Sequence, residues 1–278
     1  MEERKKGFNA AIFLLLCILS LAFLAPILIV LMNSFKGRLF IADQPFALPT
    51  AETWVALNNY LNGVAKTDFL SALGYSLFIT VFSVGVIILC TSMTAWYITR
   101  VKSRFTSGLY YLFVFSMIVP FQMVMFTMSK IANMLHIDNL IGIIFIYLGF
   151  GAGLSVFMFC GFVKGIPLEI EEAAMIDGCN PLTMFFRVVF PILRPTAITV
   201  AILNAMWIWN DYLLPSLVIG TEYRTIPIAV QYLKGGYGSV DMGAMMALLV
   251  LSIIPIIVFY LTCQKYIIRG VVAGAVKG

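Results

Sequence analysis

Long runs that contain no Asp, Glu, Lys or Arg most constrain what this chain can fold into. A helix that crosses the hydrocarbon core of a bilayer needs roughly 20 mostly apolar residues, and five runs meet that length. A sixth, shorter run continues in apolar residues beyond one charge, Asp211, as far as Gly220. The six runs lie at residues 7–35, 69–99, 105–129, 139–163, 195–210 and 242–264. They predict an all-α integral membrane protein with six transmembrane helices.

The composition agrees with this prediction. The 278 residues are 62% hydrophobic and 11% charged, whereas soluble domains are about 45–50% apolar and about 25% charged. We expect one transmembrane domain over residues 1–278, with a cytoplasmic loop at 164–194 and a tail at 265–278. Its helices are expected near residues 10–32, 69–97, 107–128, 140–162, 195–219 and 242–264.

The positions of the Lys and Arg residues predict the orientation, because cytoplasmic loops of membrane proteins carry the excess of basic residues. The segments that include both termini and the loop 164–194 hold 12 of the 18 basic residues, and the opposite segments hold six. Both termini and this loop are therefore predicted to be cytoplasmic. Topology accounts for the net charge of +5, so no nucleic-acid partner is expected. The aromatic residues beside the basic turn 100–104 fit an interfacial belt: Trp96, Tyr97, Tyr110 and Tyr111.

The sequence lacks motifs for catalysis, ATP binding and metal binding. It contains no HExxH, GxSxG or GxxxxGK[ST] pattern, so we expect an unaided chain neither to catalyse a reaction nor to bind ATP. His136 is the single histidine, and the five cysteines form no CxxC pair, so no metal site is expected. The methionines around Pro120 are interpreted as adaptable packing rather than as soft-metal ligands. If transport is driven by ATP, another polypeptide must hydrolyse it.

Two glycine pairs lie in or just after the run 139–163. Gly149 and Gly153, and Gly161 and Gly165, are each four residues apart, the GxxxG spacing that lets another helix approach closely. The two pairs fall on different sides of a helix that turns about 100° per residue. We therefore expect two neighbouring helices, one at each pair.

A charged stretch, residues 169–195, separates two membrane-length runs. Pro167 can occupy a first helical position, and the acidic residues after it suit the positive end of a helix dipole. Gly178 can end this short helix, because glycine takes the left-handed conformation without steric cost. A second amphipathic stretch then runs on to Pro191. We expect a partner outside the bilayer to recognise this segment.

The spacing in this segment resembles the cytoplasmic loop of permease subunits of ATP-binding cassette (ABC) importers. Their signature is E-A-A, three residues, G, nine residues and then I-x-L-P. Here Glu172, Ala173 and Ala174 are followed after three residues by Gly178. Nine residues later the chain reads Val-Val-Phe-Pro, which ends at Pro191 and substitutes conservatively for the usual Ile and Leu.

The resemblance implies the type I ABC importer permease fold, in which the short helix of the loop docks into a cleft on an ATPase subunit. The coupling residues that it implies are Glu172, Ala173, Ala174, Asp177, Gly178 and Pro191. The C-terminal sequence GVVAGAVKG looks like that of sugar permeases of the maltose-transporter type, where the tail lies close to the ATPase dimer. The tail residues concerned are Gly274, Ala275, Lys277 and Gly278.

The resemblance also implies a set of partners. These are a second homologous permease subunit, two ATP-binding subunits, an extracytoplasmic substrate-binding protein and a sugar, in the lipid bilayer of a bacterial or archaeal cell membrane. It implies no cofactor on this chain, since ATP and Mg belong to the partner ATPase subunits. The expected function is that of a permease for an ATP-driven sugar importer, with an oligosaccharide as the expected cargo.

The candidate translocation path lies at the end of the fifth helix. Its polar and aromatic residues are Trp207, Trp209, Asn210, Asp211 and Tyr212, and similar residues are common in sugar permeases. An ionisable residue at membrane depth often faces a polar path, and aromatic rings suit the faces of sugars. The alternative is an anchor at the outer interface, with the aromatic rings in its belt.

Other transport functions remain open from the residues alone. A permease for amino acids, peptides or polyamines would keep the loop motif but not the tail. An ion-coupled secondary carrier would work without an ATPase, but the spans show no two repeated halves with broken helices, and intramembrane charge is limited to about Asp211. A purely structural anchor would give no reason for the motif.

Overall fold

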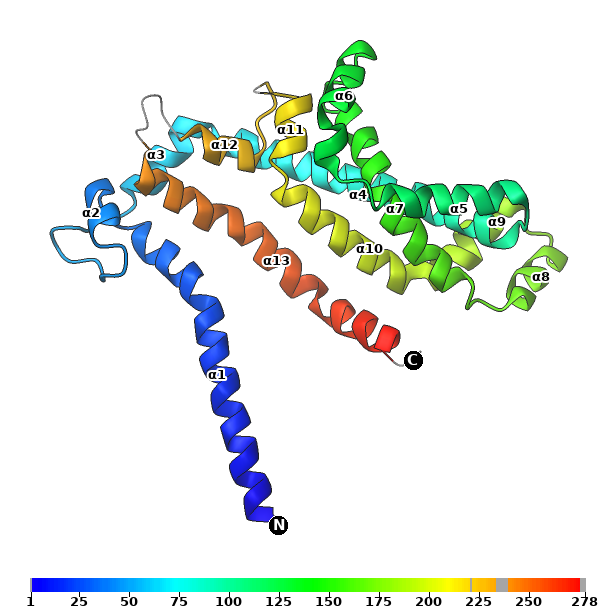
Figure 1. Cartoon of the computed structure of the whole chain (residues 1–278), viewed down its shortest axis with the longest axis horizontal. Coiled ribbons are helices and arrows are strands. Elements are labelled where there is room, and N and C mark those ends of the chain that lie inside the picture. Colours follow the sequence, from blue (N-terminus) through cyan, green and yellow to red (C-terminus); the bar gives the residue numbers. More distant parts are fainter. Residues whose placement is uncertain (1, 221, 234–239, 276–278) are drawn as a thin grey trace. The chain divides into compact units, whose positions relative to one another are not determined.

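The computed structural model describes residues 2–220, 222–233 and 240–275, and these residues form helices joined by short connections (Figure 1). The chain divides into two compact units. Unit 1 comprises Met1–Leu70 and Ala229–Pro255, and unit 2 comprises Ser71–Ile228 and Ile256–Gly278. Three helices run from one unit into the other: α4 (Phe69–Arg100), α12 (Ile226–Tyr232) and α13 (Met242–Ala275).

Unit 1 contains α1 (Glu2–Asn33), α2 (Arg38–Asp43), α3 (Asn58–Thr67) and the first half of α13. The connection between α1 and α3 folds back on itself. Phe35 stacks on Trp54 with ring centroids 4.9 Å apart, and an antiparallel bridge joins Lys36 to Trp54. The Asn59 amide donates to the carbonyl oxygens of Ser34 and Lys36, both at 2.8 Å. These bonds satisfy backbone acceptors in the connection that follows α1.

The start of α13 packs closely on α3. A Cβ at Gly243 would lie 2.4 Å from Oδ1 of Asn59, and a Cβ at Gly63 would lie 3.1 Å from Cγ of Leu248. An ion pair between Lys66 and Asp241 adds a polar contact between α3 and the residue just before α13. The loop after the first helix is thus a packed cap held by aromatic, small and charged residues.

Unit 2 is built around α7 (Gly142–Val163), whose inward residues include the fully buried Tyr147 and Phe159. It packs against α5 (Arg104–Ser116) and α10 (Phe190–Asn210). A Cβ at Gly151 would lie 2.8 Å from both Oδ1 of Asn204 and Cδ1 of Ile87, so α4 and α10 both approach α7 there. Buried polar groups join the helices at this level, because the Asn204 amide donates to the Ser155 hydroxyl at 3.2 Å.

The close approaches on α7 differ from those that the GxxxG spacing predicted. Gly153 meets α5, where a Cβ would lie 2.6 Å from the Ser116 hydroxyl, but Gly149 and Gly161 have nothing within 4 Å of an added Cβ. The prediction of two neighbours was wrong in number and in position, because α4 and α10 approach α7 at Gly151 and α5 approaches it at Gly153. The contacts fall on Gly151 and Gly153, which are two residues apart and so face different neighbours.

Five helices among the described residues are long and apolar enough to cross a membrane: Ile12–Asn33, Phe69–Arg100, Gly142–Val163, Pro181–Asn210 and Met242–Lys265. The expected third helix, 107–128, is instead a bent pair, in which α5 and α6 (Phe121–Met134) meet at 107°. The count reaches six if that pair forms one span. Pro120, the N-cap of α6, explains the break, because proline has no N–H to donate and restricts the residue before it.

The expected fifth helix, 195–219, is also divided. It begins earlier, since α10 starts at Phe190, and it ends at Asn210, before the short helix α11 (Leu213–Val218). Asp211 takes an extended conformation, with φ of −75° and ψ of 121°, which stops the helical hydrogen bonding. α11 then packs on α6, and the Ser129 hydroxyl donates to the Leu217 carbonyl at 2.8 Å.

Candidate functional site

The charged segment forms a short helix, α8 (Leu168–Ile176), next to α9 (Pro181–Met184) at one end of unit 2 (Figure 1). Pro167 is the N-cap, one residue before the position that the sequence suggested, and Glu169 and Glu171 lie in the first turn. Carboxylates in a first turn are favoured there, because the unpaired N–H groups of a helix start carry partial positive charge. Local sequence therefore fixes where α8 begins.

Gly178 ends α8 as the sequence predicted. Its φ is +82°, in the left-handed region that favours glycine. The Cys179 N–H donates to the Ala174 carbonyl and the Gly178 N–H donates to the Met175 carbonyl, both at 3.0 Å. These two bonds form a Schellman motif, which satisfies carbonyl groups at the helix end. The chain then turns sharply towards α9.

One carboxylate of α8 is buried and fixes the helix to α4. Glu171 is 3% exposed and accepts hydrogen bonds from three groups. Arg100 Nε and Nη2 lie 2.8 and 2.6 Å from its Oε1, and the Trp96 indole N–H lies 2.9 Å from its Oε2. Arg100 Nη2 also donates to the Ile166 carbonyl at 3.0 Å. Trp96 and Arg100, at the end of α4, thus hold the start of α8 through charge-assisted bonds, which are the stronger class of hydrogen bond.

The sequence did not lead us to the contact of Glu171 with Arg100 and Trp96, because the acidic residues of the segment were treated together. A signal was present, because Glu171 and Ala174 are three residues apart and therefore share one face of a helix. Both are buried in the structure. Their partner Arg100 is 71 residues away in the chain, so the sequence pattern alone did not identify it.

The remaining surface of α8 is exposed, and much of it is apolar. Glu172, Ala173 and Asp177 are exposed beside Gly178, whereas Ala174 points into unit 2. The exposed apolar side chains, with their exposed fractions, are Leu168 at 49%, Ile170 at 40%, Met175 at 53% and Ile176 at 87%. We call these four residues, together with Glu172 and Ala173, the exposed face of α8. Apolar side chains gathered on a short helix are typical of a surface that contacts another protein.

The chain returns to the membrane-length helix α10 through a π-helical turn, η1 (Phe185–Val189). The Phe190 N–H donates to the Phe185 carbonyl, five residues back. Pro191, which is exposed, lacks an N–H and so cannot supply the next bond of a regular helix. Phe185 and Val189 are fully buried and anchor this turn in the core of unit 2.

At the other end of α10, the structure brings Asp211 and Trp207 to Tyr147. The Tyr147 hydroxyl donates to Oδ2 of Asp211 at 3.1 Å, and its ring meets that of Trp207 edge to face at 5.4 Å. Oδ1 of Asp211 accepts from the backbone N–H groups of Leu213 and Leu214, at 3.0 and 3.3 Å. Asp211 therefore holds the break between α10 and α11 together.

The other path candidates divide by exposure. Trp209 is 7% exposed and belongs to the interior, while Trp207 and Tyr212 are 39% and 42% exposed. The Asn210 amide donates to the Met206 carbonyl at 2.7 Å. Asn210 is exposed as well, so Trp207, Asn210 and Tyr212 are the exposed members of this set.

The C-terminal tail is described only in part. Gly274 and Ala275 lie in the last turn of α13, and Lys277 and Gly278 fall outside the described residues. No group of three His, Cys, Asp or Glu side chains that could hold a metal ion occurs within the part of the chain that the structure describes.

The chain is similar in sequence to known transport proteins. Residues 87–273 match the family model described as binding-protein-dependent transport system inner membrane component. The chain is 40% identical over 261 residues to the probable starch degradation products transport system permease protein AmyC of Thermoanaerobacterium thermosulfurigenes, covering 94% of each chain. It is 34% identical over 273 residues to the multiple sugar-binding transport system permease protein MsmG of Streptococcus mutans, covering 95% of this chain and 96% of that one.

Solved structures share the fold. A chain of a bacterial ABC transporter involved in the import of the acidic polysaccharide alginate superposes with a TM-score of 0.78 and 24% identity. The match covers 94% of this chain and 96% of that chain. A bacterial alginate ABC transporter in complex with an alginate pentasaccharide-bound periplasmic protein gives a TM-score of 0.69 at 15% identity, with 95% of each chain covered.

Proposed function

Because this chain belongs to the family of binding-protein-dependent transport system inner membrane components, we propose that it is a permease subunit of an ATP-driven sugar importer. The exposed face of α8 is the observation that carries the proposal. It presents four apolar side chains beside Glu172 and Ala173, on a helix whose other side is fixed to α4. A surface that is both apolar and rigidly held suits transmission of a partner's movement.

The partner at this face would be an ATP-binding subunit. Docking there buries the apolar side chains of α8, and Glu172 offers a carboxylate to a basic or amide group. Movement of the docked subunit passes through Glu171 and Arg100 to α4, which is long and apolar enough to span the membrane. Gly178 and Pro191 shape the chain on either side, and Ala174 acts within the subunit because it is buried. ATP and Mg belong to the partner.

The names of the relatives support a sugar as the cargo. AmyC and MsmG are named for transport of starch degradation products and multiple sugars, and the solved neighbours import alginate. Trp207 and Tyr212 offer exposed aromatic rings that suit the apolar faces of sugars. The complete transporter in the cell membrane would also comprise a second permease subunit and two ATP-binding subunits, and it would work with an extracytoplasmic binding protein. The tail residues Gly274 to Gly278 would lie near the ATPase.

The experiment is Ile176→Asp in the complete transporter, assembled in proteoliposomes with its binding protein. Ile176 is 87% exposed, so the substitution leaves the fold of the subunit nearly unchanged. Loss of a central apolar contact costs about 2 kcal/mol of binding, so affinity for the ATP-binding subunit should fall about thirtyfold. ATP-driven uptake of labelled maltooligosaccharide should fall with it.

Leu135→Ala is the matched control, because Leu135 is an exposed apolar residue outside this segment. It should leave ATPase binding unchanged. Normal ATPase binding by Ile176→Asp would refute the role of α8. Uptake of labelled amino acids, peptides or polyamines in place of sugar would keep the coupling role and refute the cargo. Uptake without any ATPase subunit would mean an ion-coupled carrier.

A further inference from the structure

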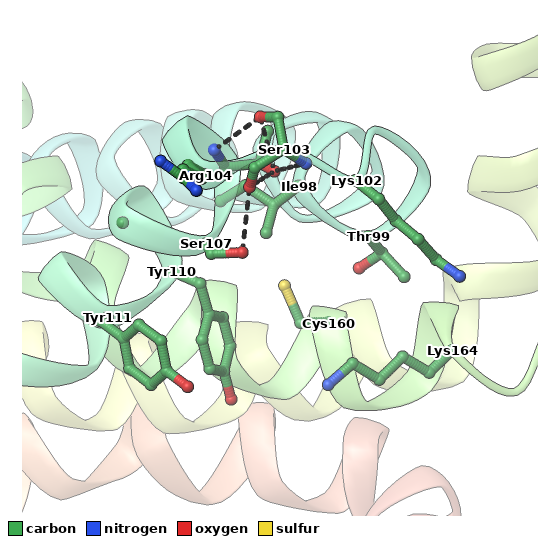
Figure 2. A pocket seen from close by; sticks show the side chains of 12 residues that line it. Ile98, Thr99, Lys102, Ser103, Arg104, Ser107, Tyr110, Tyr111, Cys160 and Lys164 are labelled. Atoms are coloured by element: carbon green, nitrogen blue, oxygen red, sulfur yellow. Dashed lines mark hydrogen bonds between the residues drawn. The ribbon is translucent and has the colours of Figure 1, made fainter.

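A second site lies in unit 2, away from the exposed rings at the other end of α10. The end of α4, the start of α5 and the end of α7 line an open pocket of about 860 Å³ (Figure 2). Its lining includes Thr99 from α4, Tyr110 and Tyr111 from α5, and Cys160 from α7. The volume lies within the roughly 300–1,000 Å³ typical of small-molecule sites.

The charge of this pocket is of one sign. Lys102, Arg104 and Lys164 line it, and no Asp or Glu does. Both ion pairs found in the described ranges involve other residues, so these three cations have no carboxylate partner there. The nearby Arg100 is already engaged by Glu171. The pocket therefore favours a negatively charged ligand.

Donors for such a ligand are in place. The Lys164 ammonium lies 5.4 Å from the centre of the Tyr110 ring, and Figure 2 shows it on the same side as the Tyr110 hydroxyl. In the described part of the chain this hydroxyl has no hydrogen-bond partner. The hydroxyls of Thr99 and Ser107 already donate to backbone carbonyls. The two ammonium groups, the Arg104 guanidinium and the Tyr110 phenol are thus the donors available to an anion.

The pocket lies where two membrane-length helices end. The candidate span Phe69–Arg100 ends one residue after the lining residue Thr99, and Gly142–Val163 ends one residue before Lys164. About 20 helical residues cross the hydrocarbon core, so helix ends of this kind lie at the level of the lipid headgroups or beyond it. Next to the pocket, α5 exposes apolar side chains to its surroundings: Phe105 at 67%, Tyr111 at 69% and Leu112 at 61%. A ligand with an anionic head and an apolar body would match both surfaces.

We propose that this pocket binds the headgroup of an anionic phospholipid. The phosphate accepts hydrogen bonds from Lys102, Lys164 and the Tyr110 hydroxyl, and the acyl chains cover the apolar side of α5. Basic pockets between membrane helices on the cytoplasmic side are suited to anionic headgroups. The bound lipid would hold the α4–α5 turn at the end of the helix that carries Arg100, the partner of Glu171. The site is independent of the proposed cargo.

The test measures lipid retention by the purified full-length chain in detergent, using native mass spectrometry. Phosphatidylglycerol and phosphatidylcholine with identical acyl chains are supplied together, and wild type should retain the former preferentially. Each lysine near an anionic lipid contributes about fivefold in affinity, so Lys102→Gln combined with Lys164→Gln should lower retention by about 25-fold. Lys130→Gln, which removes an exposed charge outside the pocket, should change nothing.

Two further measurements separate a specific site from a folding defect and from free phosphate. The pair Lys102→Arg and Lys164→Arg keeps the charge and should keep the lipid, while Tyr110→Phe should lower retention without any change of charge. Equal retention by wild type and the double Gln variant would overturn the proposal. So would equal loss of lipid in the Gln and Arg double variants, since that result would reflect folding. Displacement of phosphatidylglycerol by equimolar inorganic phosphate would show a free-anion site and overturn the lipid assignment.

Discussion

The substitution Glu171→Gln tests whether the buried carboxylate holds α8 to α4. The amide keeps the shape of the side chain but removes its charge, so the Arg100 guanidinium, with a side chain only 19% exposed, loses its counter-ion. A glutamine oxygen can still accept from the Trp96 indole, so only the contacts of Arg100 are weakened. Removing one partner of a buried pair costs about 3–5 kcal/mol. Because Arg100 retains some solvent contact, we expect about 3 kcal/mol, the lower end of that range.

Hydrogen exchange of the isolated chain in detergent, followed by mass spectrometry, measures this cost locally. The backbone amides of α8 should open on the order of a hundredfold more often, since each 1.4 kcal/mol is a factor of ten. Amides in the middle of α7 should keep their protection, because local openings differ in free energy across a structure. Glu172→Gln is the matched control, since this neighbouring carboxylate is exposed and its loss should stay within about 0.5 kcal/mol.

A double substitution decides whether the pair itself is responsible. Replacing Arg100 and Glu171 together by methionine removes both buried charges, and such replacements are often neutral in stability. The double variant should therefore exchange more slowly in α8 than either single methionine variant, which reveals a coupling between the two sites. Wild-type exchange in Glu171→Gln would refute the reasoning. The reasoning would also be refuted if the effects of the two single methionine substitutions on exchange simply added up to that of the double substitution.

Three further predictions concern the backbone and one ion pair. Gly178→Ala should destabilise the end of α8 by about 1–2 kcal/mol, seen as faster exchange there, because the φ of +82° strains any residue with a Cβ. Gly151→Ala should cost about 1–3 kcal/mol through overpacking, measured as a lower melting temperature, whereas Gly149→Ala, with open space around it, should not lower that temperature. Burial raises the pKa of Asp241, but the hydrogen bonds from Lys66 and the Ala244 N–H, together with the charges of Lys66 and Arg38, outweigh burial and leave the pKa below its usual value. The stability that this pair contributes should be present above the ordinary Asp pKa of about 3.9 and be lost as pH falls below that value. Asp241→Asn should abolish this acid dependence of the thermal unfolding temperature. If the variant and wild type showed the same pH dependence, the prediction would be contradicted.

Prediction from the sequence succeeded where a local property decides the structure. The uncharged runs identified the membrane-length helices because the length of an apolar run sets whether a helix can cross a bilayer. Gly178 was correctly identified as the end of α8, since a left-handed residue strongly favours glycine. The family resemblance came from the spacing between Glu172 and Pro191, and the match of residues 87–273 to the family model confirms it.

Prediction failed where a contact between distant segments decides. A single helix over 107–128 was wrong, although Pro120 was visible, because transmembrane helices tolerate proline when neighbours compensate. The glycine spacing predicted two close neighbours of α7, but only packing showed that three helices approach it, at Gly151 and Gly153. Asp211 was left between a path and an anchor, and its bonds to Tyr147 and the start of α11 came only from the structure.

The sequence by itself therefore determined an all-helical membrane chain, the position of the short helix α8 along the chain and the family to which the chain belongs. These follow from hydrophobic length, backbone conformational preference and motif spacing, which act over a few residues. The tertiary structure alone decided that Glu171 faces inward to Arg100, that Ala174 is buried while Ile176 is exposed, and that three cations share one pocket. Those outcomes depend on which helices meet, because an ion pair or a pocket exists only when folding brings distant side chains together.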